Sequence, residues 1–273
     1  MVVIWAADGG RPARTASTRV HVVIDDVNDH PPTFDADSYE AWIAEDIAAG
    51  TCFLAVSASD RDRGLNAAVT YDIDWTELRP SAPDSHQPFA VDAESGTICL
   101  REELDFESQP VFVLPLVARD GGVESLSGRS TLTVNVVDVN DNAPTIVVEV
   151  ISGSAAGGIE VEENSAAGGL TLALVTVLDA DSGTNGRVVC GLNDTSAAFR
   201  LVEVHDGQYH VTAVSELDRE EREFHALAIH CRDLGEPPLS SSAVVSVRSV
   251  HRHFSRKNKK ITFRTHRLPF KQR

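Results

Sequence analysis

The chain has 273 residues, enough for two to three domains, and a formal charge of −17. Residues 248–273 hold ten of the 24 Lys and Arg residues and no acid, so residues 1–247 hold 14 basic against 41 acidic residues, a net charge of −27. A surface this acidic disfavours nucleic acid and anionic lipid as partners and favours cations.

Two β-strands are expected within residues 1–25, where the sequence is strand-like up to an apolar run at 20–24. The start at Met1–Trp5 lacks the positively charged n-region of a signal peptide. No stretch approaches the roughly 18 apolar residues that a transmembrane helix needs. If the protein is extracellular, we therefore expect its targeting and anchoring segments outside this chain.

An acidic phrase, Asp-Val-Asn-Asp followed closely by proline, stands at residues 26–34 and again 112 residues later at 138–146. Each copy follows an alternating apolar run that is typical of a strand. The carboxylates repel one another and the prolines remove backbone donors, so neither helix nor strand is favoured there. We expect a hard cation with oxygen ligands to neutralise each phrase.

Between and after the two phrases, segments of alternating apolar and polar residues are separated by short stretches of turn-forming residues. Strands are predicted at 111–118, 130–136, 224–230 and 243–247. Glycine-rich turns are expected at 121–122 and 183–186, and an irregular, proline-containing loop at 74–88. No long segment has the 3.6-residue period of a helix, so an all-β fold is predicted.

Four further acidic landmarks recur in the same order, which makes a repeat of about 112–119 residues. The matched pairs are Glu45-Asp46 with Glu163-Asn164, Asp60–Asn66 with Asp179–Asn185, Glu103–Glu107 with Glu216–Glu220, and Ala118–Gly122 with Cys231–Gly235. Short strands over roughly 110 residues predict tandem seven-strand Greek-key, Ig-like sandwiches.

The repeat also predicts the domain boundaries. Ala6–Gly10 matches Ala118–Gly122, so residues 1–29 are expected to be the C-terminal strands of a truncated repeat with its linker. A complete repeat is expected at 30–141 and a repeat lacking its C-terminal linker at 142–247. Residues 248–273 form a basic tail that we expect to be disordered, because nothing in it resembles a sandwich and a charge run without a packed core does not fold.

These motifs, in this order and period, resemble the extracellular repeats of the cadherin superfamily over residues 1–247. The Asp-x-Asp-x-Gly-x-Asn run is more similar to protocadherin or Fat/Dachsous-type members than to classical cadherins. The resemblance implies calcium-dependent adhesion at the extracellular side of the plasma membrane. The implied partner is a cadherin-type ectodomain on an apposed cell, either homophilic or related heterophilic. The alternative is a passive calcium-stabilised spacer, with adhesion in repeats outside this chain.

The resemblance also implies three calcium ions between consecutive repeats, held by both repeats and the linker. At the second phrase it implies Glu45, Asp105 and Glu107 from the preceding repeat, and Asp138, Asn140 and Asp141 with a carbonyl of Asn142 from the linker. From the following repeat it implies Asp179, Asp181 and Asp233 with a carbonyl near Asn185. All are oxygen donors, as calcium requires.

The first and third junctions are expected to be incomplete. The first has Asp26, Asn28, Asp29, Asp60, Asp62 and Asp120, with carbonyls near His30 and Asn66, but lacks the preceding repeat's acids. One reasonably formed calcium site is expected there. The third has Glu163, Asp218 and Glu220, but Arg248–Arg252 replaces the acidic phrase, so no high-occupancy calcium is expected.

Two other functions of these acidic residues, an EF-hand loop and a catalytic pair, are disfavoured by their sequence context. Asp60 and Asp179 do not open EF-hand loops, because Tyr71 and Cys190 stand where such a loop has Glu. Repetition of Asp105 and Glu107 in each sandwich favours structure over a catalytic acid–base pair, so no enzyme is expected.

The remaining features leave alternatives open. The four cysteines, Cys52, Cys99, Cys190 and Cys231, fit no zinc motif; they are expected to be small buried or cross-strand residues, and in a secreted protein they could form disulfides within each repeat. Asn193 begins a glycosylation sequon or a plain surface turn. The basic tail could suit nucleic acid, a membrane surface or nuclear import, but an unstructured end is favoured.

Overall fold

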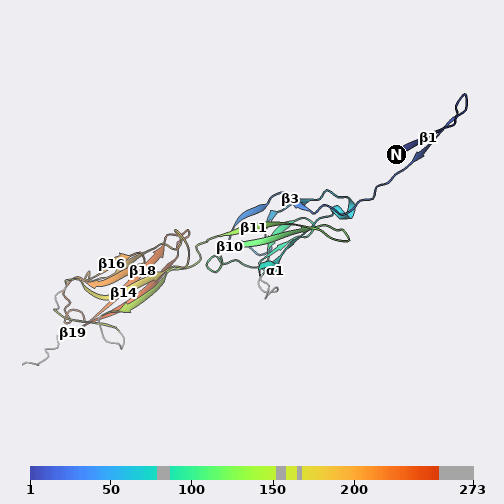
Figure 1. Ribbon diagram of the computed structural model, residues 1–273. Helices are drawn as coiled ribbons and strands as arrows, with labels where there is room; N and C mark the ends of the chain where they lie inside the picture. The colour runs from blue at the N-terminus through green and yellow to red at the C-terminus, as the bar shows by residue number, and fades with distance from the viewer. Residues whose placement is uncertain (79–86, 152–157, 165–167, 252–273) are drawn as a thin grey trace, which may run out of the picture. The chain divides into compact units, whose positions relative to one another are not determined.

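The computed structural model describes residues 1–78, 87–151, 158–164 and 168–251, and it is built almost wholly from β-strands (Figure 1). The chain divides into two compact units, Met1–Val139 and Asn140–Arg273. Within the described residues, no helix is long and apolar enough to cross a membrane.

The first unit begins with a two-stranded antiparallel sheet of β1 (Val2–Ala7) and β2 (Thr15–Val20). The apolar run at 20–24 was expected to be a strand, but β2 ends at Val20. Val20 pairs with Val2, the first residue of β1, so β1 offers no pairing partner to the residues after Val20.

The remainder of the first unit is a β-sandwich. Its strands are β3 (Thr33–Phe34), β4 (Ser38–Ala44), β5 (Cys52–Ala55), β6 (Ala58–Ser59), β7 (Thr70–Ile73), β8 (Phe89–Val91), β9 (Thr97–Leu100), β10 (Val111–Arg119) and β11 (Ser127–Val137). One sheet has the order β4-β11-β10-β7, with β4 parallel to β11; the facing strands form the sheets β5-β9-β8 and β3-β6.

Alternation along these strands explains the core of the first sandwich. In β10 and β11 every second side chain points inward, so Leu114, Leu116, Leu132 and Val134 are at most 1% exposed. Phe89 of the facing sheet fills the space between the layers. Burying each such side chain stabilises the fold by about 1.5–3 kcal/mol.

The second unit is also a sandwich, with two four-stranded sheets. Its strands are β12 (Thr145–Val150), β13 (Ile159–Glu162), β14 (Leu170–Leu178), β15 (Val188–Asn193), β16 (Phe199–His205), β17 (Gln208–Ala213), β18 (Phe224–Asp233) and β19 (Ser240–Val250). The sheet orders are β12-β14-β17-β16 and β13-β19-β18-β15, with β13 parallel to β19. The all-β fold of tandem Greek-key sandwiches is therefore confirmed.

Two local expectations differ in part from the structure. The loop expected at 74–88 does lie between β7 and β8, but it begins with a one-turn helix, α1 (Trp75–Leu78), and residues 79–86 of that loop lie outside the described residues. The basic tail was expected to be disordered from residue 248, but β19 continues to Val250. Arg248, Ser249 and Val250 pair with β13, and Ser249 is fully buried. Residues 252–273 lie outside the described residues.

The four cysteines form two disulfides, Cys52–Cys99 and Cys190–Cys231, so the alternative that the sequence left open is decided. In each bond the two residues are direct cross-strand partners, on β5 and β9 in the first sandwich and on β15 and β18 in the second. The register of the strands, rather than any cysteine motif, brings each pair together.

Candidate metal-binding site

Three acids at the end of the first sandwich form a carboxylate cluster. Glu45 directly follows β4 and is only 5% exposed. Its Oε1 accepts a hydrogen bond from the Val139 amide (2.8 Å) and its Oε2 accepts one from the Phe106 amide (2.6 Å). Ligand atoms of Glu45, Asp105 and Glu107 lie within 4.8 Å of one another. Of the acids expected from this repeat, the structure thus brings all three together.

Asp105 is held in its charged form within this cluster. The hydroxyl and the amide of Ser108 both donate to its carboxylate, at 2.7 and 3.1 Å, and these bonds lower the pKa of Asp105. An ionised carboxylate beside other acids is what a divalent cation needs as a ligand.

In the second unit, the linker asparagine Asn140 is fixed against Asp233. Asn140 is 8% exposed, and its Nδ2 donates to Asp233 Oδ1 (3.2 Å) and to the Pro237 carbonyl (2.7 Å). Asp233 is fully buried, and it accepts the amides of Gly235 (3.0 Å) and Leu239 (2.9 Å). These bonds use the amide nitrogen of Asn140 and leave its Oδ1 buried without a hydrogen-bond donor among the described residues.

The next part of the linker is clamped to Asp181. Asn142 donates to Asp181 through its backbone amide (3.3 Å) and its side-chain Nδ2 (2.8 Å), and the same Nδ2 contacts Asp141 (2.6 Å). Asp181 is 7% exposed and its amide bonds Asp179 Oδ1 (3.1 Å). Asn185 lies in the turn after Asp181, where its amide bonds the Ser182 carbonyl. Asp138, at the start of the linker, is half-buried.

The first linker repeats this arrangement within the first unit. Asn28 Nδ2 donates to Asp120 Oδ2 (3.1 Å) and to the Glu124 carbonyl (2.8 Å), as Asn140 does to Asp233 and Pro237. Asn28 Oδ1 is again buried without a donor among the described residues. Burial raises the pKa of Asp120, but bonds from Gly122, Asn28 and Leu126 outweigh it and the net pKa is lowered.

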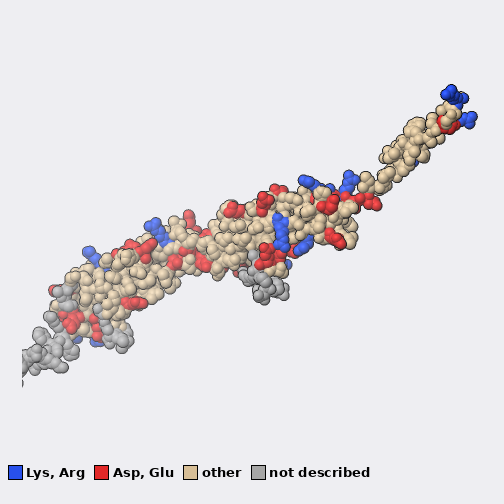
Figure 2. All heavy atoms as spheres, viewed as in Figure 1, with Lys and Arg blue, Asp and Glu red and all other residues tan. Residues whose placement is uncertain are grey.

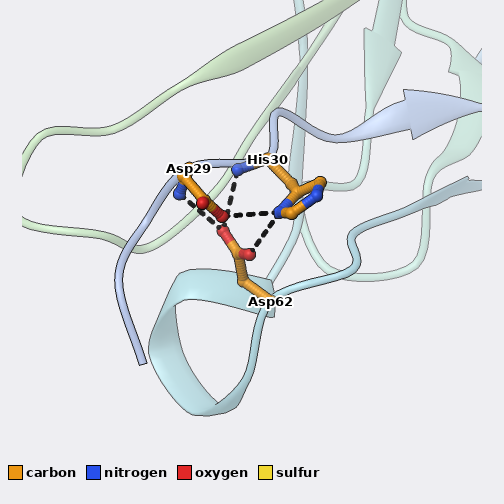
Figure 3. A group of neighbouring side chains, drawn as sticks. All are labelled: Asp29, His30 and Asp62. Carbon is orange, nitrogen blue, oxygen red and sulfur yellow. Dashed lines mark hydrogen bonds and ion pairs between the residues drawn. The ribbon is translucent and has the colours of Figure 1, made fainter. Parts of the chain in front are cut away.

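His30 takes the place of Asn142 in the first linker. Its backbone amide and its Nδ1 bond Asp62 (3.1 and 2.9 Å), and Nδ1 also lies 2.7 Å from Asp29 (Figure 3). The bond to Asp62 raises the pKa of His30. Burial raises the pKa of Asp62, but the bonds from His30 and Asp29 outweigh it and the net pKa is lowered.

The other predicted residues of the first linker gather around Asp26. Asp26 Oδ2 accepts the amide of Arg63 and the side-chain amide of Asn66, both at 3.0 Å, and Asp60 Oδ1 accepts the amide of Asp62 (2.9 Å). Asp60 Oδ2 is buried without a donor among the described residues.

At the third junction, Glu163 and Glu220 lie beside His251, whereas Asp218 Oδ1 accepts hydrogen bonds from the amides of Glu220 and Glu221.

The sequon residue Asn193 ends β15 and is exposed. On both sandwiches acidic side chains lie exposed across the surface (Figure 2).

The buried oxygens test whether these residues fit a cation. A buried oxygen without a donor costs about 1–3 kcal/mol, and Asn28 Oδ1, Asn140 Oδ1 and Asp60 Oδ2 are three such atoms. Each lies among carboxylates, and every candidate ligand at these two linkers is an oxygen except the His30 ring. The donor set therefore fits calcium.

Sequence reasoning missed two glycines that shape these clusters. A side chain at Gly122 would collide with Asn28, and one at Gly235 would collide with the side chain of Asn140. Both glycines lie in the Asp-x-Gly landmarks, where only the Asp was interpreted as a ligand. Their repetition two residues after each Asp was the signal that could have identified them.

Known proteins that resemble this chain are cadherins. The family model for the cadherin domain matches residues 39–137 and 158–248. Human protocadherin alpha-12 is 35% identical over 90% of this chain and 25% of its own length. Human protocadherin-16 is 37% identical over 89% of this chain and 7% of its own length. The chain thus spans a quarter or less of these relatives.

A solved structure shows the same fold. The extracellular cadherin domains 1–5 of protocadherin gamma B2 match with a TM-score of 0.78 at 30% identity, covering 91% of this chain and 44% of that one.

Proposed function

The chain belongs to the cadherin family, whose members are adhesion proteins rather than enzymes, and on this basis we propose that it supports calcium-dependent cell–cell adhesion. Calcium ions bind at the linkers and make consecutive repeats rigid. The partner is a cadherin-type ectodomain, of the same or a related kind, on an apposed cell. The chain acts on the extracellular side of the plasma membrane, attached through segments outside it.

The observation that carries the calcium proposal is the matched pair of buried asparagine oxygens. Asn28 Oδ1 and Asn140 Oδ1 are both buried without a donor among the described residues, while the nitrogen of each side chain is fully used. Because the same geometry arises twice, it is a property of the linker motif. A cation that is coordinated by these oxygens offsets the free-energy cost of burying them.

The charge of the second linker and its neighbours supports a rigidifying role. Glu45, Asp105, Glu107, Asp138, Asp141, Asp179, Asp181 and Asp233 are eight carboxylates, against about +6 from three calcium ions. Without metal these charges repel one another; with metal most of the repulsion is cancelled. The linker then changes from a hinge to a strut. Extracellular calcium modules bind at about 10⁻⁴–10⁻³ M, so extracellular calcium keeps such sites largely filled.

Small-angle scattering of the full chain, with millimolar calcium and then with chelator, tests the strut. We expect a longer and narrower distribution of conformations with calcium. Asp181→Asn, which removes one linker-bound carboxylate, reduces this response, whereas the exposed Asp37→Asn does not. If the length and flexibility of the particle are the same with and without calcium, the proposed rigidification of the linker is contradicted.

Bead aggregation tests adhesion separately. Beads that carry the chain and clump only with calcium support adhesion by these repeats. Beads that stay dispersed under full calcium loading favour the spacer, in which repeats outside this chain hold the adhesive surface.

A further inference from the structure

At the end of the second sandwich, a histidine stands where the second linker has its first aspartate. Glu45 bonds the Val137 carbonyl through its amide (3.2 Å), and Glu163 bonds the Val250 carbonyl in the same way (2.9 Å). Val137 and Val250 are therefore equivalent, and the residue that follows each is Asp138 in one case and His251 in the other. The third cluster thus has an imidazole in place of a carboxylate.

The register of β13 and β19 brings this imidazole onto two glutamates. Glu162 pairs with Val250, so Glu163 and His251 leave the parallel strands side by side. His251 Nδ1 contacts Glu163 Oε1, and His251 Nε2 lies 3.8 Å from Glu220 Oε1. Ligand atoms of the three residues lie within 4.8 Å of one another.

A second, independent observation points to a ligand at this cluster. Glu163 is only 7% exposed, and its Oε2 is buried without a hydrogen-bond donor among the described residues. At the equivalent Glu45 the amide of Phe106 bonds Oε2 (2.6 Å). The amide of Arg219, which corresponds to Phe106, helps to lower the pKa of Glu163 but makes no hydrogen bond of ordinary geometry to its Oε2. A buried carboxylate oxygen with no donor beside a second carboxylate calls for a cation.

The donor set decides which cation fits. Calcium takes six to eight oxygen ligands, whereas this cluster offers two carboxylates and one nitrogen. Zinc is typically four-coordinate, accepts imidazole and carboxylate together, and takes water in a remaining position. Bonds of about 2.0–2.2 Å in a tetrahedral arrangement require His251 Nδ1 and Glu163 Oε1 to separate so that the ion lies between them, and Glu220 to move closer. The side chains of His251 and Glu220, 60% and 64% exposed, have room for this movement.

We propose that Glu163, Glu220 and His251 form a binding site for a zinc-type transition-metal cation. The two carboxylates balance the charge of the ion, and His251 selects it over calcium because imidazole is a poor ligand for hard cations. The site lies within the second sandwich, so it is independent of calcium binding at the two acidic linkers.

The test is a zinc titration of the full chain in millimolar calcium, followed by long-range proton–nitrogen NMR of the histidine rings. We expect the ring signals of His251 to shift and to saturate near one equivalent of zinc. His251→Ala should abolish this binding event, and Glu163→Gln should weaken it at least about 10-fold, as the loss of groups around metals commonly does.

His30→Asn is the matched control, because among the described residues His30 is likewise in contact with two acids, and its replacement leaves the third cluster intact. Zinc binding at His251 should persist in this variant. The proposal is overturned if the His251 ring signals do not respond to zinc, or if His251→Ala binds zinc as tightly as the unaltered chain. In that case His251 is a counter-ion of the two glutamates only.

Discussion

The imidazole of His225 lies edge-on against the ring of Phe199 in the core of the second sandwich, with ring centroids 5.2 Å apart. The first sandwich has the same contact between two phenylalanines, Phe112 and Phe89, at 5.1 Å. His225 is 6% exposed, and neither of its ring nitrogens has a hydrogen-bond partner within the described part of the chain. A polar ring thus occupies an apolar position of the repeat.

Replacing His225 by Phe should stabilise the second sandwich. The change restores the aromatic pair of the first sandwich and removes two buried polar atoms, each of which costs about 1–3 kcal/mol. We expect a gain of about 1–2 kcal/mol in the free energy of unfolding, measured by urea denaturation at pH 8. An unchanged or lower stability would show that the imidazole has a partner in solution.

The same variant should change the pH dependence of stability. Burial lowers the pKa of His225, and the charge of Arg222 acts in the same direction. The charges of Asp194 and Glu221 and the backbone of Arg222 act against it, and the net pKa is lowered. The unfolded state therefore binds a proton more readily, and stability is lost as pH falls below the unfolded value of about 6.5. Between pH 8 and pH 5.5 the unaltered chain should lose more stability than His225→Phe. Equal losses would contradict this explanation.

Replacing Gly235 by Ala should displace the linker. The new methyl group collides with the side chain of Asn140, which must give up its bonds to Asp233 and Pro237. We expect a loss of about 1–3 kcal/mol in stability and, if the calcium proposal holds, at least about 10-fold weaker calcium binding by calorimetry. Gly191→Ala is the control, since a methyl group there meets nothing within 4 Å.

Replacing Glu45 by Gln should separate hydrogen bonding from metal binding. Gln has one acceptor where Glu45 offers two, so the amide of Val139 or Phe106 meets a donor. In chelator we expect the free energy of unfolding to fall by about 1–3 kcal/mol. With calcium the loss should be larger, because a ligand charge is also gone. Glu40→Gln, an exposed change on β4, should have little effect in either condition.

Removing either disulfide should destabilise its own sandwich by a similar amount. Cys52 and Cys99 are 47 residues apart and Cys190 and Cys231 are 41 apart, so each bond restricts the unfolded chain to a comparable extent. Replacing both cysteines of a pair by Ala should cost about 2–4 kcal/mol, measured by thermal and urea denaturation. A loss at only one pair would contradict this prediction.

The sequence by itself determined the fold class and the composition of the linkers. The structure confirms the strands predicted at 111–118, 130–136, 224–230 and 243–247, which lie within β10, β11, β18 and β19. They could be predicted because a half-buried strand alternates apolar residues on its buried face with polar residues on its exposed face. The one-turn helix α1 is too short to show a period. The calcium ligands stay a prediction. Within each unit, however, the structure brings together residues that the sequence repeat had predicted as ligands.

Only the tertiary structure decided the contacts that depend on strand register. Cys52 meets Cys99 because β5 and β9 pair in one register, and His251 meets Glu163 because β13 runs parallel to β19. The contact of Gly235 with Asn140 joins residues 95 positions apart. A local motif specifies which atoms are available for a site. Their distances follow from pairings between distant segments, and no local pattern encodes those pairings.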